Sequence, residues 1–474
     1  PTDCNTSPTN HNTSYETSLR KCCDARYHSH FTACHTCFRQ GVPVSKKASA
    51  LVPRRWLRFM PIIFITYSFA SVDRSNYSIA APGGLERDLG MTPALTGLAA
   101  GLFFVGYFFF QVPAAGYAER KSVRKLLFWS ILSWGLLSSA QGLISQPWLL
   151  IVDRLLLGAA EAAVAPALLV LVLNWFHARE RARADTFSML GGLIATVGMS
   201  VVSGYLVTLV GWRWMLIIEG APALVWAFVF RALVVDRPSE ATWLSEPEKR
   251  SIETALREDE EMPAKPTGYR HAFLSPTIIL LTIQYLVWNF GLYGFLFWLP
   301  TVLKEATAHG LGEVGVLAAV PYAVAAVVLL CVSYLSDRLP RRRGLFIWPL
   351  LIVGGVTLYA SSVTHHFWLA FVLLIVAEAA MQGPQGAFFA SIPTYVPRDV
   401  AGGAMGLINS FGGLGGFIGA YIVGWFIGRT GTSGAFTFMA GSVLVAAILA
   451  FVVERLRRPA STPLAAQVPQ QQIS

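Results

Sequence analysis

Long runs of hydrophobic residues, separated by short polar segments, dominate the chain from Trp56 onward. A helix that crosses a membrane needs about 20 mostly apolar residues, and about twelve runs reach that length. We predict spanning helices at residues 57–81, 94–117, 125–145, 148–175, 187–209, 214–235, 276–301, 313–336, 344–363, 367–391, 403–427 and 434–454. Six of them lie on each side of one long polar segment. The pattern therefore predicts an all-α integral membrane protein with about 12 transmembrane helices in two six-helix bundles.

These helices divide the chain into five predicted parts. They are a polar, disordered N-terminal extension (1–53), a first bundle (54–235), a cytoplasmic central loop (236–272), a second bundle (273–458) and a disordered C-terminal tail (459–474). The extension holds a single C-x-x-C pair, Cys34 and Cys37, with histidines nearby. Zinc sites of this kind use a second pair of ligands at similar spacing. We expect no metal site, with a zinc site as the alternative.

Composition agrees with a membrane protein and argues against binding to nucleic acid. Charged residues make up 14% of the chain and hydrophobic residues 54%, whereas soluble domains contain about 25% charged residues. The net charge of +10 comes largely from short basic segments at residues 54–58, 120–125, 179–183, 338–343, 398 and 455–458. Every second loop carries these segments, and cytoplasmic loops are the ones enriched in Lys and Arg. We expect a monomer in the cell membrane (an inner or plasma membrane), with both termini cytoplasmic.

The run that starts at Pro147 carries two ionisable residues in its interior. Arg154 and Glu161 lie seven residues apart, so two helical turns bring them to one face. A charge at the centre of a membrane helix costs roughly 2.5–3.5 kcal/mol on insertion scales, and small residues such as Gly158 let neighbouring helices approach closely. We interpret this helix as the wall of an internal, water-accessible path, broken locally at Pro166. A buried ion pair with a structural role is the alternative.

Two features recur at nearly the same spacing and indicate an internal repeat. An acid followed by arginine occurs at residues 119–120 and again at 337–338, which are 218 residues apart. A second glutamate inside a predicted helix, Glu378, follows Glu161 by 217 residues. Repeated halves of this kind place a substrate site near the midplane, between the halves.

Together these features resemble the major facilitator superfamily. Within it, the chain is similar to the anion:cation symporter family, and particularly to its tartrate, phthalate and hydroxyphenylacetate permeases. The similarity covers residues 55–458 and is carried by the segments 72–74, 106–107, 111–113, 154–161, 174–184 and 235–238. The first acid–arginine loop departs from the family motif at Ala115, Glu119 and Ser122, where the motif has Gly, Asp and Gly.

The resemblance implies roles for four charged residues in the first bundle. In related symporters, the acids that match Asp73 and Glu161 couple transport to protons, and a carboxyl in a low-dielectric path can take up and release a proton. Arg74 and Arg154 carry a planar guanidinium that fits a carboxylate, and we predict that both bind the substrate. The alternative for Asp73 is that it only pairs with Arg154 and joins two helices.

Further polar and aromatic residues are predicted to complete the substrate site. They are Tyr107, Tyr285, Asn289, Tyr293, Gln382 and Asn409, with Glu378 as a further group of the second half. The three on the predicted helix 276–301 recur every fourth residue and so share one face. Packing without any contact to substrate is the alternative for the aromatic members.

The two acid–arginine loops are predicted to act in gating. Their residues are Glu119, Arg120, Arg124, Asp337 and Arg338. An acid here can face the positive end of a neighbouring helix, while basic residues anchor at lipid headgroups.

The sequence thus predicts a secondary active transporter that imports a small organic anion, a carboxylate, with a proton by alternating access. We expect no enzymatic activity and no cofactor other than the coupling proton. The alternatives are an anion sensor in the membrane, an exchanger or an efflux antiporter. Drug antiporters of the superfamily usually carry a Gly-Pro pair in the fifth helix, and residues 191–204 contain no proline, which disfavours efflux.

Overall fold

The computed structural model describes residues 52–260, 275–307, 310–395 and 398–456. The chain divides into one compact unit at Pro1–Arg55 and a second at Trp56–Ser474, and the second is described here by itself. The predicted N-terminal extension and C-terminal tail, including Cys34 and Cys37, lie almost entirely outside the described residues. The limits predicted for the two bundles stay a prediction.

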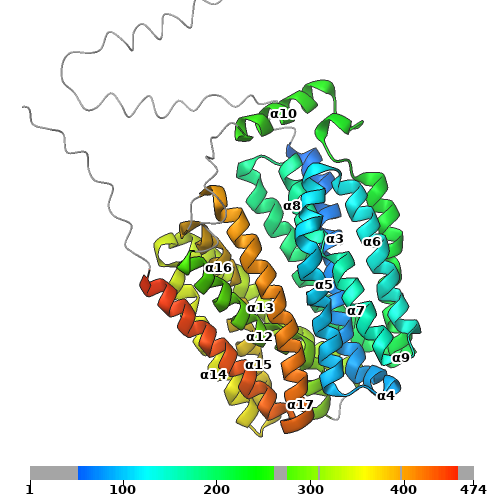
Figure 1. Ribbon diagram of the computed structural model, residues 1–474, viewed down its shortest axis with the longest axis vertical. Coiled ribbons are helices and arrows are strands. Elements are labelled where there is room, and N and C mark those ends of the chain that lie inside the picture. The colour runs from blue at the N-terminus through cyan, green and yellow to red at the C-terminus, as the bar shows by residue number, and fades with distance from the viewer. Residues whose placement is uncertain (1–51, 261–274, 308–309, 396–397, 457–474) are drawn as a thin grey trace, which may run out of the picture. The chain divides into compact units, whose positions relative to one another are not determined.

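Helices account for nearly all of the described residues (Figure 1). In the first half they are α3 (Val52–Ala80), α4 (Glu86–Leu89), α5 (Pro93–Arg120), α6 (Val123–Ala140), α7 (Pro147–Glu161), α8 (Val164–Trp175) and α9 (Ala178–Leu233). The polar segment contains α10 (Glu246–Glu260), which the sequence analysis did not predict. In the second half they are α12 (Pro276–Ala306), α13 (Leu311–Arg338), α14 (Trp348–Val363), α15 (Phe367–Gln382), α16 (Gln385–Ser391) and α17 (Arg398–Leu456).

The predicted twelve-helix fold is confirmed by the lengths of these helices. Among the described residues, nine stretches are long and apolar enough to cross a membrane. Two of the nine, with 48 and 54 residues, greatly exceed the roughly 20 residues of one span, so each supplies two spans. Together with α3, whose 29 residues include several polar ones, the described residues supply the twelve predicted spans.

Glycines with left-handed backbone geometry separate the spans inside the two longest helices. Gly211 in α9 has φ 79° and Gly431 in α17 has φ 74°, a conformation that glycine adopts without steric cost. They lie 220 residues apart, close to the spacing of 217–218 in the sequence repeat. Corresponding spans of the two halves therefore both end at a glycine with positive φ.

A break inside the fourth span occurs where the sequence predicted it. Helix α7 ends at Glu161 and α8 begins at Val164, and Pro166 has no N–H to donate to the carbonyl of Ala162. The tenth span breaks likewise between α15 and α16, where Pro384 caps α16. Both halves thus have an interrupted helix next to the space between them.

At the end of the helices that includes α4, opposite α10 in Figure 1, the two halves pack tightly. A Cβ on Gly97 of α5 would lie 2.4 Å from the carbonyl oxygen of Ala420 on α17, and one on Gly204 of α9 would lie 2.7 Å from that of Leu311 on α13. Within the second half, the Trp298 indole of α12 donates to the same Ala420 carbonyl at 3.0 Å and holds it in place. Small residues therefore bring the two halves together here.

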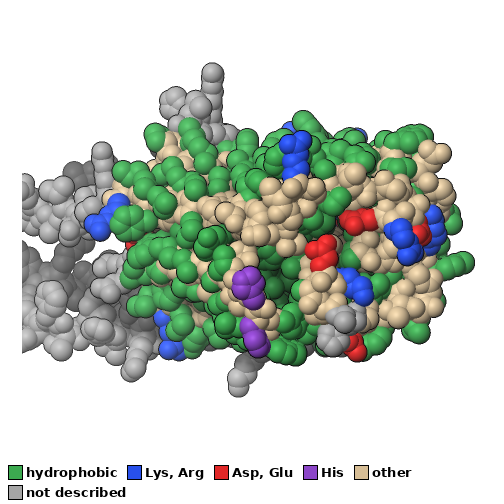
Figure 2. Space-filling view, turned by 90° about the horizontal axis from the view of Figure 1, so that it is seen from below, with side chains coloured by type: hydrophobic (Ala, Val, Ile, Leu, Met, Phe, Trp, Pro, Cys, Tyr) green, Lys and Arg blue, Asp and Glu red, His purple; other side chains and the backbone are tan. Residues whose placement is uncertain are grey.

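The short loops at the α4 end carry few charges, and Figure 2, which views this face, shows acidic and basic side chains scattered among hydrophobic and uncharged ones. The Trp212 indole donates to Asp88 at 2.9 Å, and this bond, with Arg87 nearby, holds the pKa of Asp88 below its usual range. The contact joins α4 to the turn at Gly211.

Candidate functional site

A cavity of about 280 Å³ lies between helices of the two halves. Its first-half wall comes mainly from α3, α5 and α9, and its second-half wall from α12, α13, α15, α16 and α17. Seven of the predicted site residues line it: Arg74, Tyr107, Tyr285, Asn289, Tyr293, Gln382 and Asn409. Glu378 lines it as well. The structure therefore brings these residues to one cavity, while their roles stay predictions.

The charged pair that forms next to this cavity is Arg74 with Glu161. The Arg74 guanidinium donates from Nη2 to Oε1 of Glu161. The Glu161 side chain is 0% exposed and that of Arg74 is 21% exposed. The buried acid thus holds an arginine that still faces the cavity.

Aromatic rings support the Arg74 guanidinium. Its Cζ lies 5.6 Å from the ring centre of Phe103 and 5.4 Å from that of Tyr107, within the range of cation–π attraction. A guanidinium has five N–H donors, and Glu161 accepts from one nitrogen. Donors therefore remain for a ligand in the cavity.

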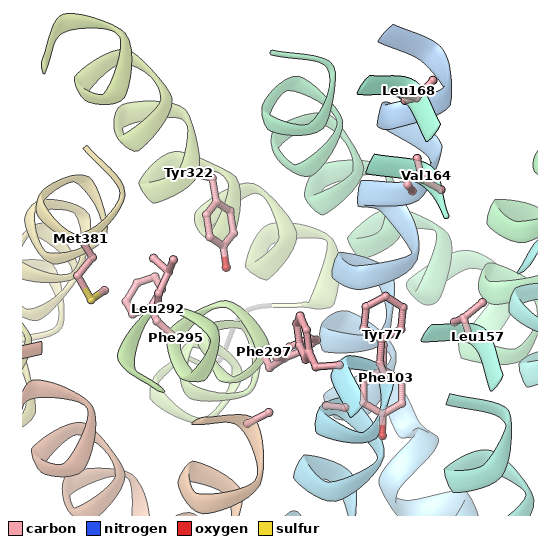
Figure 3. Packing of buried hydrophobic residues seen from close by; sticks show 14 of the residues in the cluster. Tyr77, Phe103, Leu157, Val164, Leu168, Leu292, Phe295, Phe297, Tyr322 and Met381 are labelled. Atoms are coloured by element: carbon pink, nitrogen blue, oxygen red, sulfur yellow. The ribbon is translucent and has the colours of Figure 1, made fainter. Parts of the chain in front are cut away.

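Arg154 does not line the cavity. Its side chain is 0% exposed, and its Cζ lies 4.6 Å from the ring centre of Tyr77 and 5.3 Å from that of Phe103. Figure 3 shows these two rings close together, one from α3 and one from α5. Nη1 of Arg154 donates to the backbone oxygen of Asp73 at 3.3 Å. Arg154 therefore contacts α3 and is not placed to meet a ligand in this cavity.

Two ion pairs offered as alternatives by the sequence analysis do not form. Among the described residues, no ion pair joins Arg154 to either Asp73 or Glu161. Side chains on a helix lean toward its N-terminus, and α3 and α7 run in opposite directions. Arg74 therefore leans toward the level of Glu161, whereas Arg154 leans the other way, toward Tyr77.

Asp73 is buried behind the cavity wall and does not line it. It accepts a hydrogen bond from the hydroxyl of Ser138 on α6. The acid that pairs with the cavity-lining arginine is Glu161 and not Asp73. A role of Asp73 in proton coupling stays a prediction.

The second-half wall is aromatic. Tyr293 packs on Phe104 of the first half, with ring centres 4.5 Å apart, and Tyr285 stacks on Phe388 at 5.1 Å. Asn289 donates to the Tyr285 carbonyl at 2.6 Å. Figure 3 shows Tyr322 pointing from α13 toward α12, where its hydroxyl donates to the Leu296 carbonyl at 3.3 Å.

Several residues at or near the site were missed by the sequence analysis. Ser138, Phe104 and Tyr322 have no pattern that distinguishes them from other residues of their helices. Glu219 on α9 does have one, because it is an acid inside a predicted span, as Glu161 is. It is 6% exposed and accepts a hydrogen bond from Ser203 at 2.6 Å.

In the first predicted gating loop, the acid that contacts the neighbouring helix end is not the expected one. Glu119 is exposed, and the acid at the N-terminus of α6 is Asp236, which accepts from the Arg124 amide at 2.7 Å and from the Ser122 hydroxyl. In the second loop Asp337 pairs with Arg343 at 3.2 Å. The acid that contacts the N-terminus of α6 therefore comes from the segment after α9 and not from the gating loop itself.

Comparison with known proteins identifies the family. The sequence model described as Major Facilitator Superfamily matches residues 63–419 and also residues 302–472. The chain belongs to the major facilitator superfamily.

Relatives in this superfamily are similar along most of the chain. Two proteins of Agrobacterium vitis, named provisionally as tartrate transporters, are 31% and 32% identical and cover 88% and 84% of this chain and 94% and 93% of their own lengths. A quinolone resistance transporter of Acinetobacter baumannii is 29% identical over 84% of this chain and 93% of its own length. The predicted resemblance to the anion:cation symporter family is confirmed, and so is the prediction that the chain is a transporter and not an enzyme.

Solved structures of the superfamily share the fold. The crystal structure of a bacterial homologue of the human lysosomal transporter Spinster, inward-facing and unoccupied, matches with a TM-score of 0.70 at 17% identity. The match covers 85% of this chain and 98% of that one. This likeness concerns the fold alone.

Proposed function

We propose that the chain imports a small organic anion together with a proton, by alternating access, as a monomer in the plasma membrane with both termini in the cytoplasm. The observation that carries this proposal is the Arg74–Glu161 pair beside the cavity. It joins a cation that suits a carboxylate to an acid that can hold a proton.

The pair couples proton binding to substrate binding, because the Glu161 carboxylate and the substrate carboxylate compete for Arg74. While Glu161 is ionised, it occupies Arg74; a proton on Glu161 removes that negative charge and leaves the guanidinium to a substrate carboxylate. When Glu161 loses the proton, it binds Arg74 again and displaces the substrate. Each state keeps a buried charge next to an opposite one, which a low-dielectric site requires.

The packing of the two halves supports a state that opens toward the α10 end. At the α4 end glycines join α5 to α17 and α9 to α13. Toward the other end, Gly116 on α5 and Gly406 on α17 have nothing within 4 Å of a Cβ built on them. The basic loops lie at this same end, which the positive-inside rule assigns to the cytoplasm, so we infer an inward-facing state.

Organic acids are the substrate class that we propose. The relatives named for tartrate transport support a carboxylate substrate, and the aromatic lining of the cavity favours an aromatic acid over a sugar acid. The volume of about 280 Å³ lies just below the range of small-molecule pockets, about 300–1,000 Å³, so the ligand is small.

The test is uptake into proteoliposomes that contain the purified protein, with the outside more acidic than the inside. Tartrate, hydroxyphenylacetate, phthalate, nicotinate, sugar acids and a quinolone are compared, each with and without a proton uncoupler. We expect one acid to accumulate and the accumulation to collapse with uncoupler. Saturable binding without accumulation of any acid would contradict symport and favour the sensor or the exchanger.

Efflux is the second candidate, because a relative is named for quinolone resistance. The same vesicles separate the two, with the same outside-acid gradient and the quinolone loaded inside, because an antiporter couples the exit of its substrate to protons that enter. Loss of the quinolone driven by the gradient, with no accumulation of acids, would replace import by efflux.

A further inference from the structure

Glu378 is a buried acid of the cavity wall that the transport cycle described above does not use. It lies on α15 in the second half, whereas Arg74 belongs to α3 in the first half. Its side chain is 3% exposed. Within the described part of the chain, Oε2 of Glu378 is buried and accepts no hydrogen bond.

A second acceptor without a donor lies one helical turn further along α15. Oε1 of Gln382 is also buried and accepts no hydrogen bond from any described residue. Two polar side chains nearby on the same wall donate elsewhere: Tyr322 to the Leu296 carbonyl at 3.3 Å, and Asn289 to the Tyr285 carbonyl at 2.6 Å. Buried acceptors are normally satisfied, so this wall suits a ligand that brings hydrogen-bond donors.

The charges of the cavity point to the same kind of ligand. Among the described residues that line it, Arg74 is the one Lys or Arg, and Glu161 already pairs with it. A ligand with a carboxylate alone would engage Arg74 and leave the buried Glu378 oxygen without a donor. A buried carboxylate is stable when a cation or several donors accompany it.

Aromatic rings from both halves line the cavity that Arg74 and Glu378 also line. Tyr67, Phe104, Tyr107, Tyr285, Tyr293 and Phe389 line the cavity with Tyr322. Aromatic side chains stack on an aromatic ligand and also attract an ammonium group through their ring faces. The cavity therefore offers a cation, aromatic rings and an acid.

We propose that the substrate is an aromatic zwitterion, a carboxylic acid that also carries a protonated amine, with the carboxylate at Arg74 and the ammonium group at Glu378 and Gln382. This inference rests on the proposed function, because it requires that Arg74 binds a carboxylate. It adds that Glu378 selects among aromatic acids. The ammonium group donates its N–H groups to the two free acceptors, and the cavity then holds no unpaired charge.

The test compares two ligands that differ in one group, 4-(aminomethyl)benzoate and 4-methylbenzoate. Both have the same ring and carboxylate, but the first alone carries an ammonium group. Affinities are measured by calorimetry on the full chain in lipid nanodiscs, for the unmodified protein, Glu378→Gln and Arg74→Gln. Glu246→Gln, which changes an exposed acid on α10, is the matched control.

We expect the unmodified protein and Glu246→Gln to bind the amino acid at least about tenfold more tightly than the methyl analogue, as a charge-assisted hydrogen bond provides. Glu378→Gln should lose this preference, and Arg74→Gln should weaken both ligands. Equal affinities in the unmodified protein, with binding still dependent on Arg74, would overturn the inference and leave the proposed function intact. If neither acid binds, the inference fails together with the aromatic-acid form of that function.

A second variant keeps the test decisive if Glu378→Gln does not fold, as judged by size-exclusion chromatography. Gln382→Leu removes the other acceptor and keeps the acid. We expect its preference for 4-(aminomethyl)benzoate to fall by several fold. An unchanged preference would overturn the placement of the ammonium group on α15.

Discussion

At the scale of single residues, the direction in which side chains leave their helices decides which buried charges meet. Arg154 and Glu161 share a face of the span, as their spacing predicted, but they serve different neighbours. Glu161 pairs with Arg74 beside the cavity, while Arg154 lies on the Tyr77 ring and contacts the Asp73 carbonyl. The spacing of residues in one helix could predict the shared face, but not the partners on another helix.

Arg154→Lys tests whether this arginine positions α3 or binds the substrate. Lysine keeps the charge but loses the planar group that lies on two rings, so we expect the protein to lose about 1–3 kcal/mol of stability. Substrate affinity should change by less than about threefold, well under 1 kcal/mol. Thermal unfolding and calorimetry measure the two effects. A loss of affinity as large as that of Arg74→Lys, at unchanged stability, would instead make Arg154 a substrate ligand, as the sequence predicted.

At the scale of helices, close contact between α5 and α7 sets the position of the charged residues. A Cβ on Gly158 would lie 1.8 Å from the carbonyl oxygen of Phe103, and one on Gly106 would lie 2.1 Å from that of Leu155. The Phe103 ring faces both Arg74 and Arg154. Small residues in a membrane helix predicted a close approach, but which helix approaches became known only from the three-dimensional arrangement.

Gly158→Ala should therefore disturb the site although it adds one methyl group. The new Cβ would push α5 away from α7, at a cost of typically 1–3 kcal/mol for an overpacked contact. We expect a lower unfolding temperature and weaker substrate binding together. Gly198→Ala is the control, because a Cβ there meets nothing within 4 Å. Equal behaviour of the two variants would show that the α5–α7 contact does not support the site.

At the scale of the whole described unit, the internal repeat is more extensive than the repeated acidic residues alone indicated. It also includes the glycine turns that end spans and the interruptions within helices. Gly211 and Gly431 end corresponding spans, and both halves interrupt their fourth helix beside the cavity. The apolar runs predicted twelve spans, because length and hydrophobicity determine what crosses a bilayer. They could not predict α10, whose Ile252 is buried and which packs against α8, far away in the sequence. Nor could they show that Asp236, rather than Glu119, accepts a hydrogen bond from the first turn of α6.

A larger side chain at the glycine contact of the α4 end should open that end. Gly204→Val places a branched side chain against the Leu311 carbonyl and Gly315, so the closed arrangement becomes strained. Spin labels at the exposed Leu209 and Trp368, in a background without the six native cysteines, report the distance between the halves. We expect a longer distance in Gly204→Val than in the control Gly198→Val. The same distance distribution in both would show that α9 and α13 do not form a gate.

The most direct test of coupling through the Arg74–Glu161 pair is transport by Glu161→Gln in proteoliposomes, with Glu246→Gln as the control. Glutamine cannot take up and release a proton, and it leaves Arg74 without a competing charge. The account predicts that Glu161→Gln still exchanges labelled substrate across the membrane but no longer accumulates it when an inward proton gradient is imposed. Accumulation at the level of the unmodified protein would contradict it, since proton coupling would then not pass through Glu161.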